Sequence, residues 1–193
     1  SFVRACVRDI LADGVVDAVV LRVDSPGGGV TASDEIWYEV ERLKQRGIPV
    51  VASYGSVAAS GGYYVSCGAD HIVAQETCTT GSIGVIAQIM TFEGLFEKVG
   101  VEPVTLVASN SPRKNVSNDT FRSWNEEDRE TVIEMLDAAY DTFATRVRDG
   151  RGDALGSEVA TIIDGSAYTA AEALELGLID SIGYLDDAIV EAE

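Results

Sequence analysis

Apolar positions along the first part of the chain repeat in two ways, one typical of strands and one typical of helices. Residues 15–23 (VVDAVVLRV) and 48–53 (IPVVAS) are almost continuously apolar and rich in β-branched side chains, as in strands buried on both faces. Apolar side chains at helical spacing predict one helix over residues 4–11 and another from about residue 33 to a stop at Gly47.

The remainder of the chain continues this alternation with shorter elements. A glycine-rich turn after the second strand is expected to lead into a small-residue helix over residues 60–67. We then expect a short helix over residues 95–99 and short strands over residues 71–74, 81–85, 104–107 and 178–180. Strands that alternate with helices predict an α/β fold with a mostly parallel sheet and flanking helices.

Two capping boxes mark where helices begin in the second half. Ser123-x-x-Glu126 predicts the start of a long helix, and Thr169-x-x-Glu172 predicts the start of a short one. No repeat, charge block or low-complexity linker divides the sequence, so we expect a single domain over residues 1–193.

Composition narrows the possible functions. With 46% hydrophobic residues among 193, the chain can bury a core and is not disordered. Its net charge of −18 repels phosphate backbones and anionic lipid, so we expect no nucleic-acid partner. The three lysines stand against eleven arginines. An acidic, lysine-poor composition is typical of a halophilic archaeon, although an ordinary acidic protein has it too.

Cysteines and apolar runs exclude further classes. The three cysteines form no CxxC pair and no even framework, so neither a disulfide scaffold nor a zinc site is expected. The longest uncharged stretch, residues 47–69, is too polar and glycine-rich for a membrane span. Because the sequence begins at Ser1 without Met, we expect a truncated chain whose membrane anchor lies outside it.

Two glycine-rich segments follow buried strands, where sites form in open α/β sheets. Residues 24–29 (DSPGGG) let backbone N–H groups approach a ligand oxygen, although a tight turn explains the same run. No Lys-Ser/Thr follows, so this is not a phosphate-binding P-loop. In the second segment, Ser60 lies between Ala-Ala and Gly-Gly at a helix start, where helix N–H groups can stabilise an anion. A close-packed helix without chemistry is the alternative.

A serine nucleophile needs a base. The only histidine, His71, lies in an apparent strand eleven residues after Ser60, so a Ser-His-Asp triad is not expected. Lys44 and Lys98 lie near the ends of exposed helices. Lys114 lies in the polar, irregular segment 109–124, where a functional loop is plausible and a surface lysine is the simple alternative.

Together these segments resemble the signal peptide peptidase A family of Ser-Lys proteases, which has the ClpP/crotonase superfamily fold. The resemblance begins near residue 20 and extends to the C-terminus. The matching stretches are LRVDSPGGG (21–29), AASGGYY (58–64), TGSIGV (80–85) and YT…A…GLID (168–180). Several ordered motifs at family-like spacing are more specific than any one alone.

The resemblance implies a role for each site residue. It makes Ser60 the nucleophile and Lys114 the general base, with Ser82 holding the lysine amine. The implied oxyanion hole is formed by backbone N–H groups of Gly27, Gly28 and Gly61. No metal and no other cofactor is implied.

The resemblance also implies a serine endopeptidase that degrades membrane-embedded remnant signal peptides after their release. Family members are usually anchored by an N-terminal span, with the catalytic centre on the extracytoplasmic side of the cell membrane. They assemble into homo-oligomeric rings, and we expect an octamer. The substrate groove should accept small or apolar side chains, because Ala, Gly, Val, Ile and Tyr surround the site.

Three other functions fit the same fold. A crotonase-like acyl-CoA enzyme would need a phosphate site, which the scarcity of Lys and Arg near the glycine loops opposes. A ClpP-like Ser-His-Asp protease would need a histidine after residues 81–84, and none follows. A non-catalytic assembly subunit is the third alternative, if Lys114 is not a base.

Overall fold

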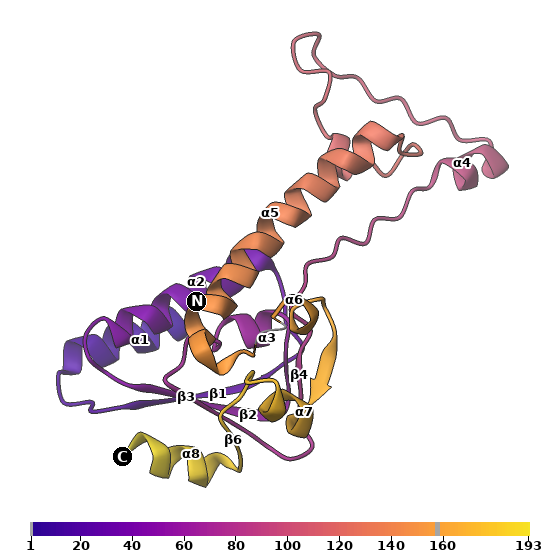
Figure 1. Ribbon diagram of the computed structural model, residues 1–193. Helices are drawn as coiled ribbons and strands as arrows, with labels where there is room; N and C mark the ends of the chain where they lie inside the picture. The colour runs from indigo at the N-terminus through magenta and orange to yellow at the C-terminus, as the bar shows by residue number, and fades with distance from the viewer. Residues whose placement is uncertain (1, 157–158) are drawn as a thin grey trace. The chain divides into compact units, whose positions relative to one another are not determined.

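The computed structural model describes residues 2–156 and 159–193 and forms two compact units (Figure 1). Unit 1 comprises the described parts of Ser1–Val85 and Tyr140–Glu193, and unit 2 is Ile86–Ala139. No helix in the described ranges is long and apolar enough to cross a membrane.

Unit 1 is built around one sheet. Within the described residues its strands are β1 (Val19–Ser25), β2 (Val50–Ala59), β3 (His71–Ala74), β4 (Thr79–Gly81), β5 (Ala167–Thr169) and β6 (Ser181–Ile182). Their order is β5-β4-β2-β3-β6, and β1 also pairs with β2. Only the β4–β5 pair is antiparallel. The prediction of an α/β fold with a mostly parallel sheet is confirmed.

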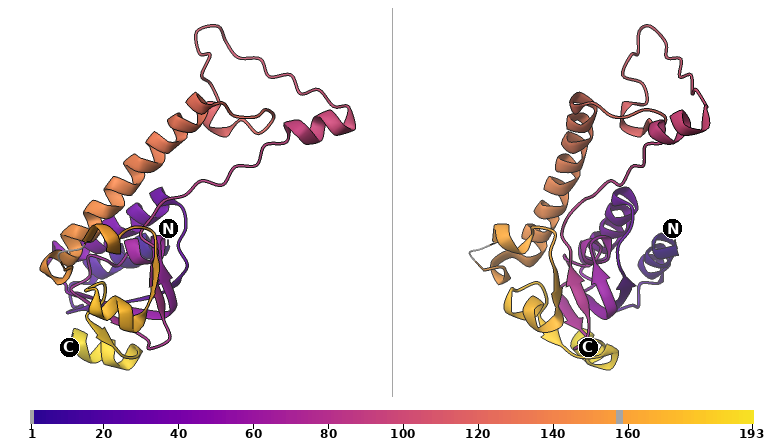
Figure 2. Two further views of the ribbon diagram at one scale, coloured as in Figure 1. Left: turned by 45° about the vertical axis from the view of Figure 1, so that its right-hand side comes forward. Right: turned by 90° about the vertical axis from the view of Figure 1, so that its right-hand side faces the viewer.

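Helices flank this sheet on both faces (Figure 2). Unit 1 contains α1 (Phe2–Asp13), α2 (Val30–Lys44), α3 (Gly61–Tyr64), α6 (Val159–Ile162), α7 (Ala170–Glu175), α8 (Leu185–Ala192), the 3-10 helix η2 (Gly152–Ala154) and the second half of α5 (Glu126–Arg151). Unit 2 contains α4 (Glu93–Val99), the 3-10 helix η1 (Val116–Asn118) and the first half of α5.

The core follows from the two-residue period of β2. Val50, Ala52 and Tyr54 point into the larger core, which also contains residues of α2, α3 and α5. Val51 points to the opposite face of the sheet. There it packs with Val73 of β3 and Ala188 of α8. A strand with both faces buried must be almost continuously apolar, which is the pattern that predicted it.

β2 changes neighbours along its length. Its first half pairs with β3, from Val51 opposite His71 onwards, and its last residues pair with β4, ending with Ala59 opposite Gly81. The predicted turn at residue 55 is therefore wrong, because β2 continues through Gly55 as a bulged strand. Bulges bend a strand while keeping it in the sheet, and glycine permits the close backbone approach.

Several predicted strands differ from the structure. The strand expected at residues 15–23 is β1, which begins four residues later at Val19, and of its residues only Val23 is buried. Residues 82–85 and 104–107 are not paired with any described strand. Residues 178–180 form no strand, and β6 begins three residues after the expected start. β-branched residues favour extended backbone, but a strand also needs a partner. The strand at 71–74 is confirmed as β3.

The capping predictions divide in the same way. Thr169 and Glu172 form the predicted reciprocal box at α7. The box at the long helix involves Asn125 and Asp128 instead of Ser123 and Glu126. The Asp128 N–H donates to Asn125 Oδ1 (2.8 Å), and the Asn125 N–H donates to Asp128 Oδ2 (3.2 Å). Asn and Asp cap as well as Ser and Glu, so a nearer pair replaced the predicted one.

A buried ion pair closes the C-terminal side of unit 1. The Arg151 guanidinium donates to both carboxylate oxygens of Asp180 (2.7 and 3.0 Å) and to the Gly177 carbonyl (2.9 Å). Burial is the largest single influence on Asp180 and opposes its ionisation. The hydrogen bond and the positive charge of Arg151, together with the Ile72 N–H, outweigh burial and hold the pKa of Asp180 below its ordinary value. The end of α5 is thereby fixed to the segment that leads into β6.

Candidate active site

Ser60 lies at the carboxyl end of β2, in the single residue between that strand and α3. Its backbone has φ 50° and ψ −120°, a region that L-residues with a side chain seldom adopt. The Ser60 N–H donates to the Gly81 carbonyl (2.8 Å), and its carbonyl accepts from the Tyr64 N–H (2.9 Å). The sharp strand-to-helix turn leaves the Ser60 side chain half-exposed at the edge of the sheet.

Ser82 repeats this geometry on the neighbouring strand. Ala59 and Gly81 are register partners, so Ser60 and Ser82 each come one residue after a paired position. Ser82 also has a positive φ, 49°, and its N–H donates to the Ser166 carbonyl (2.7 Å). Two serines in left-handed backbone at adjacent strand ends are the kind of strain that clusters at functional sites.

The glycine loop after β1 packs directly against Ser60. A Cβ atom on Gly27, which has φ 116°, would lie 2.9 Å from both Ser60 Cβ and the Gly61 nitrogen. A Cβ on Gly61 would lie 3.0 Å from the Gly28 nitrogen and 2.5 Å from Ser33 Oγ. Only glycine fits at Gly27 and Gly61, so the backbone of the loop packs directly beside Ser60. The Gly27 N–H donates to Ser25 Oγ (3.2 Å).

The short helix α3 is fixed by its two tyrosines. The Tyr63 hydroxyl donates to the Leu178 carbonyl (2.8 Å), and the Tyr64 hydroxyl donates to Asp34 Oδ1 of α2 (2.7 Å). Burial raises the pKa of Tyr63 well above its ordinary value and that of Tyr64 to about 12. Both hydroxyls therefore stay neutral donors, and they hold the helix that carries Gly61.

A cavity of about 390 Å³ opens beside the glycine loop. Its lining combines the glycines of both loops with apolar and charged residues. The apolar ones include Leu21, Ile36 and Val65, and the charged ones are Arg22 and Asp24. A cavity of this size that combines apolar walls with a few backbone amides can hold one apolar side chain of a ligand.

Lys114 lies in unit 2, in a turn where its N–H donates to the Ser111 carbonyl (3.0 Å). The residue is exposed and lines a hollow of about 290 Å³ within that unit, together with Pro112, Asp119 and Arg122 among others. The neighbouring Arg113 pairs with Glu127 and Thr131 on α5. The structure thus groups Ser60, Ser82 and the three glycines in unit 1 and assigns Lys114 to unit 2.

The other candidate bases are occupied elsewhere or distant from Ser60. The Lys44 ammonium binds the Gly68 carbonyl and lies 3.5 Å from Asp70. His71 pairs with Val51 at the start of β2, while Ser60 follows the end of the same strand. At about 3.3 Å per residue this separates them by roughly 30 Å, which excludes a triad built on that histidine within unit 1.

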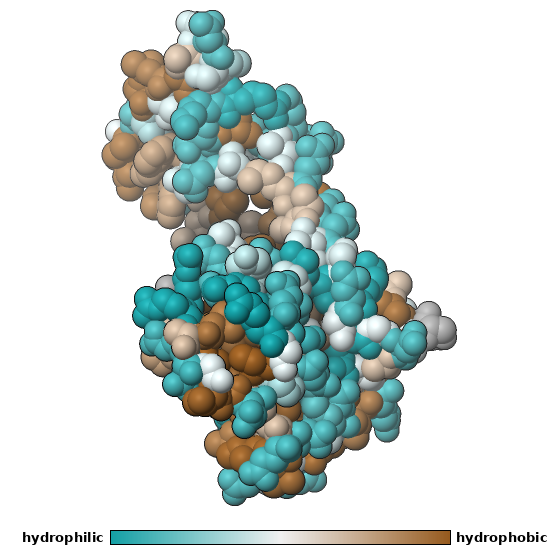
Figure 3. Space-filling view, turned by 90° about the vertical axis from the view of Figure 1, so that its left-hand side faces the viewer, coloured by the Kyte–Doolittle hydropathy of each residue, from teal (hydrophilic) through white to brown (hydrophobic). Residues whose placement is uncertain are grey.

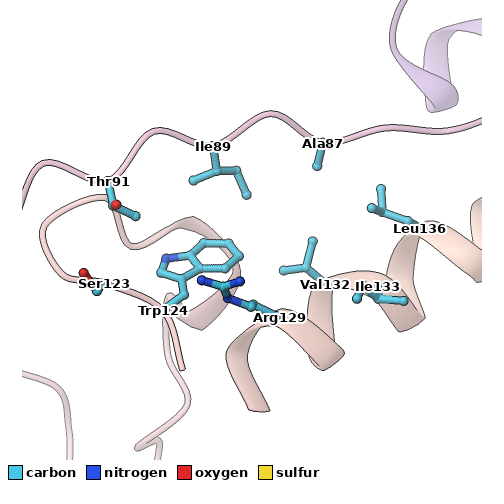
Figure 4. Close-up of a pocket in the computed structure, with 9 residues that line it drawn as sticks. All are labelled: Ala87, Ile89, Thr91, Ser123, Trp124, Arg129, Val132, Ile133 and Leu136. Carbon is cyan, nitrogen blue, oxygen red and sulfur yellow. The ribbon is translucent and has the colours of Figure 1, made fainter. Parts of the chain in front are cut away.

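Unit 2 contains an apolar groove of about 470 Å³ (Figure 4). Ala87, Ile89 and Thr91 of an extended segment face the groove, opposite Trp124 and the Val132 side of α5. The alternate residues Ile86 and Met90 are exposed. Side chains that alternate between two faces are typical of a strand, although this segment pairs with no strand among the described residues.

Sequence reasoning missed two residues that shape this site. Ser33 is buried under Gly61 and donates to the Gly29 carbonyl (3.2 Å). Asp24 binds the bulge of β2. Asp24 lies within the segment 24–29, but its contact with the bulge depends on how β1 and β2 are aligned. The Ser33 bond is local, but the place of Ser33 under Gly61 depends on tertiary packing.

Comparisons with known proteins agree on one group. The sequence model described as Peptidase family S49 matches residues 42–193. An Enterococcus faecium protein named after signal peptide peptidase SppA is 39% identical over 94% of this chain and 52% of its own length. Protease 4 of Salmonella typhi is 37% identical over 96% of this chain and 29% of its own. Serine protease SPPA, chloroplastic, of Arabidopsis thaliana is 33% identical over 97% and 27%. The chain spans about half, or less, of these relatives.

Proposed function

The chain belongs to peptidase family S49, and from this premise we propose that it is the catalytic part of a serine endopeptidase with a Ser-Lys dyad. The observation that carries the proposal is the backbone of Ser60 at φ 50°, with Gly27 and Gly61 packed against it. A half-exposed hydroxyl on a strained backbone, packed against a glycine loop, suits nucleophilic attack on a carbonyl.

In the proposed reaction Ser60 Oγ attacks the peptide carbonyl while Lys114 Nζ accepts its proton. The carbonyl oxygen becomes an anion that accepts hydrogen bonds from the N–H groups of Gly27, Gly28 and Gly61. The C–N bond breaks and the leaving amine takes the proton from Lys114. Water then attacks the acyl-enzyme, with Lys114 accepting a proton and returning it to Ser60 Oγ. Ser82 holds the lysine amine in place.

We further propose that the substrates are apolar peptides, in particular remnant signal peptides in the membrane. The cavity beside the glycine loop supports this, because its apolar walls suit the side chain next to the cut. The name of the Enterococcus faecium relative points to the same class. A peptide library varied at that position tests it, and a preference for Lys or Arg would contradict it.

Assembly into a ring, an octamer in the proposal, accounts for the surface of unit 2. Ile86, Met90, Val104 and Leu106 are each more than 70% exposed, which is unusual for apolar side chains. Figure 3 shows apolar side chains at the surface on one face of the molecule. In a ring, Ser60 of one subunit would meet Lys114 of its neighbour. We further propose that the assembly works at the cell membrane, with its catalytic side extracytoplasmic.

The decisive experiment treats the protein with a fluorophosphonate and maps the modified residue by mass spectrometry. We expect the label on Ser60, and we expect Ser60→Ala to lose both the label and peptide hydrolysis. Ser181→Ala is the matched control, because Ser181 Oγ bonds His71 (3.0 Å), away from the glycine loop. If Ser60→Ala keeps more than about a tenth of wild-type turnover, Ser60 is not the nucleophile. An unlabelled wild type would favour an acyl-CoA enzyme or an assembly subunit.

The lysine is tested separately. Lys114→Met keeps the length of the side chain and removes the amine, so we expect a loss as large as that of Ser60→Ala. Lys98→Met and Lys44→Met should stay active, and loss in either would reassign the base. If the dyad is shared, mixing inactive Ser60→Ala and Lys114→Met subunits should restore roughly a quarter of the sites. No recovery in mixed rings would show that each subunit holds a complete dyad.

A further inference from the structure

β1 and β2 lose their regular register immediately before the glycine loop. Val23 is opposite Tyr54, but Ser25 is opposite Ala58, so two steps along β1 match four along β2. Residues 55–57 form a bulge that faces Asp24, the residue between the two pairs. A bulge of this kind needs a partner for its backbone N–H groups, since the ladder no longer supplies one.

The side chain of Asp24 supplies that partner. Its Oδ1 accepts from the Ser56 hydroxyl (2.8 Å) and from the Val57 N–H (3.2 Å). The carboxyl lies directly over Gly55, where a Cβ atom would be 2.8 Å from Asp24 Cγ. The hydrogen bond from Ser56, followed by that from Val57, holds the pKa of Asp24 below its ordinary value, so the carboxylate is ionised at neutral pH.

The bulge determines what lies next to Ser60. Beyond it, β2 leaves β3 and pairs with β4, which brings the Gly81 carbonyl to the Ser60 N–H. On the other strand, Ser25 opposite Ala58 brings the glycine loop back so that Gly27 touches Ser60 Cβ. Both contacts of Ser60 therefore depend on the same local alignment.

We propose that Asp24 is a positioning residue, which fixes the bulge of β2 and so aligns the glycine loop with Ser60. This inference rests on the proposed function for its catalytic consequence. Asp24 does not reach the reacting atoms: it acts through Ser56 and Val57, three to four residues before the nucleophile.

The hydrogen bonds specify which substitutions are tolerated. Both donors bind the same oxygen, so an amide carbonyl can replace the carboxylate. We expect Asp24→Asn to keep kcat within about twofold of wild type, and Asp24→Ala to lower kcat by roughly 10- to 100-fold with little change in KM. Asp17→Ala, an exposed aspartate before β1, is the matched control and should change neither constant.

A readout without catalysis accompanies the kinetics. In the full chain, Asp24→Ala should raise amide hydrogen exchange about tenfold or more in peptides that cover Ser25–Gly29 and residues 55–60, while Asp24→Asn should not. Gly55→Ala should have the same effect in the wild-type chain, because its methyl group displaces the Asp24 carboxyl. The double variant Asp24→Ala/Gly55→Ala should exchange little faster than Asp24→Ala alone, because both substitutions disrupt the same contact between Asp24 and the bulge.

The outcomes separate this inference from the proposed function. If wild type hydrolyses no peptide but Asp24→Ala loosens the two segments and Asp24→Asn does not, the alignment role stands and the protease proposal fails. If Asp24→Ala exchanges like wild type, or if Asp24→Asn loosens the segments as much as Asp24→Ala, the positioning role is wrong, whatever the activity.

Discussion

Units 1 and 2 are stabilised in opposite ways. In unit 1, thirty apolar side chains are buried on the two faces of the sheet. In unit 2, all of which the structure describes, no apolar side chain is buried, and the two buried residues are Asp119 and Asp128. Arg122 binds both, through Asp119 Oδ2 (3.1 Å) and through Asp128 Oδ2.

The difference extends to the surface. Unit 2 is less than a third of the chain, yet it carries eleven of the 21 exposed large apolar side chains. A unit that buries charge and exposes apolar groups gains little from the hydrophobic effect on its own. The proposed nucleophile therefore lies in a unit with its own apolar core. The proposed base lies in a unit whose stability depends on ion pairs and on any partner that covers its apolar surface.

The two tryptophans make the comparison measurable, since Trp37 lies in unit 1 and Trp124 in unit 2. In the Trp37→Phe variant only Trp124 remains, so its fluorescence follows the unfolding of unit 2 in urea. In the Trp124→Phe variant the fluorescence of Trp37 follows the unfolding of unit 1. We expect the midpoint of unit 2 to be lower by about 1 M or more, because less surface is buried there. Superimposable curves would contradict this and show that the units unfold together.

Removing Arg122 should sharpen the contrast. Arg122→Met leaves two buried carboxylates without their cation, and we expect unit 2 to lose about 1–2 kcal/mol of unfolding free energy. This is below the usual cost of breaking a buried pair, because the Arg122 side chain is 38% exposed. Arg129→Met, an exposed arginine in the same unit, is the control. An equal shift in the Trp37 signal would mean that Arg122 stabilises both units.

The pH dependence separates the two ion pairs. Hydrogen bonding from Arg122 holds the pKa of Asp128 in the folded protein below its ordinary value of 3.8. The ion pair therefore stabilises unit 2 fully at pH values above 3.8. This stabilisation is lost as the pH falls through the lower pKa of the folded state. We expect the unit 2 midpoint to fall from about pH 5 to pH 3, and Asp128→Asn to flatten that profile. Asp180→Asn should flatten only the profile of unit 1, where Arg151 lowers the Asp180 pKa. A flattened unit 2 profile in Asp180→Asn would contradict the separation.

The smallest effect concerns the proposed link between the units. Ser82→Ala removes one hydrogen bond to the lysine amine, which is worth about 0.5–1.5 kcal/mol, so kcat should fall by roughly 2- to 12-fold. Neither urea curve should move, because Ala and Ser are equally strained at φ 49°. An activity loss as large as that of Ser60→Ala would instead make Ser82 indispensable.

Patterns that depend on neighbours in sequence were predictable, and patterns that depend on partners in space were not. Helical period identified α1, α2 and α5, and the Thr169 box gave the start of α7. The glycine-rich run that begins at Gly55 predicts a turn. No local signal reveals that the Asp24 side chain lies over Gly55, within the sheet. Residues 104–107 have strand propensity without a partner.

The site divides in the same manner. The glycine loop and Ser60 have local signatures, and the structure brings them together. The alignment of Ser60 with Ser82 follows from strand register, which the sequence does not encode in any single segment. Roles for Lys114 and the oxyanion glycines stay predictions, and Lys114→Met tests the first of them.

The left-handed backbone of Ser60 has an evolutionary consequence. Glycine adopts φ 50° and ψ −120° without strain, so Ser60→Gly relieves about 1–3 kcal/mol that serine stores there. Selection for stability alone would therefore favour loss of this hydroxyl. A lineage that retains serine at this position does so against the thermodynamic gradient, which is what continued selection for the hydroxyl would produce. By the same reasoning, a descendant with glycine at this position would gain stability and lose the proposed nucleophile.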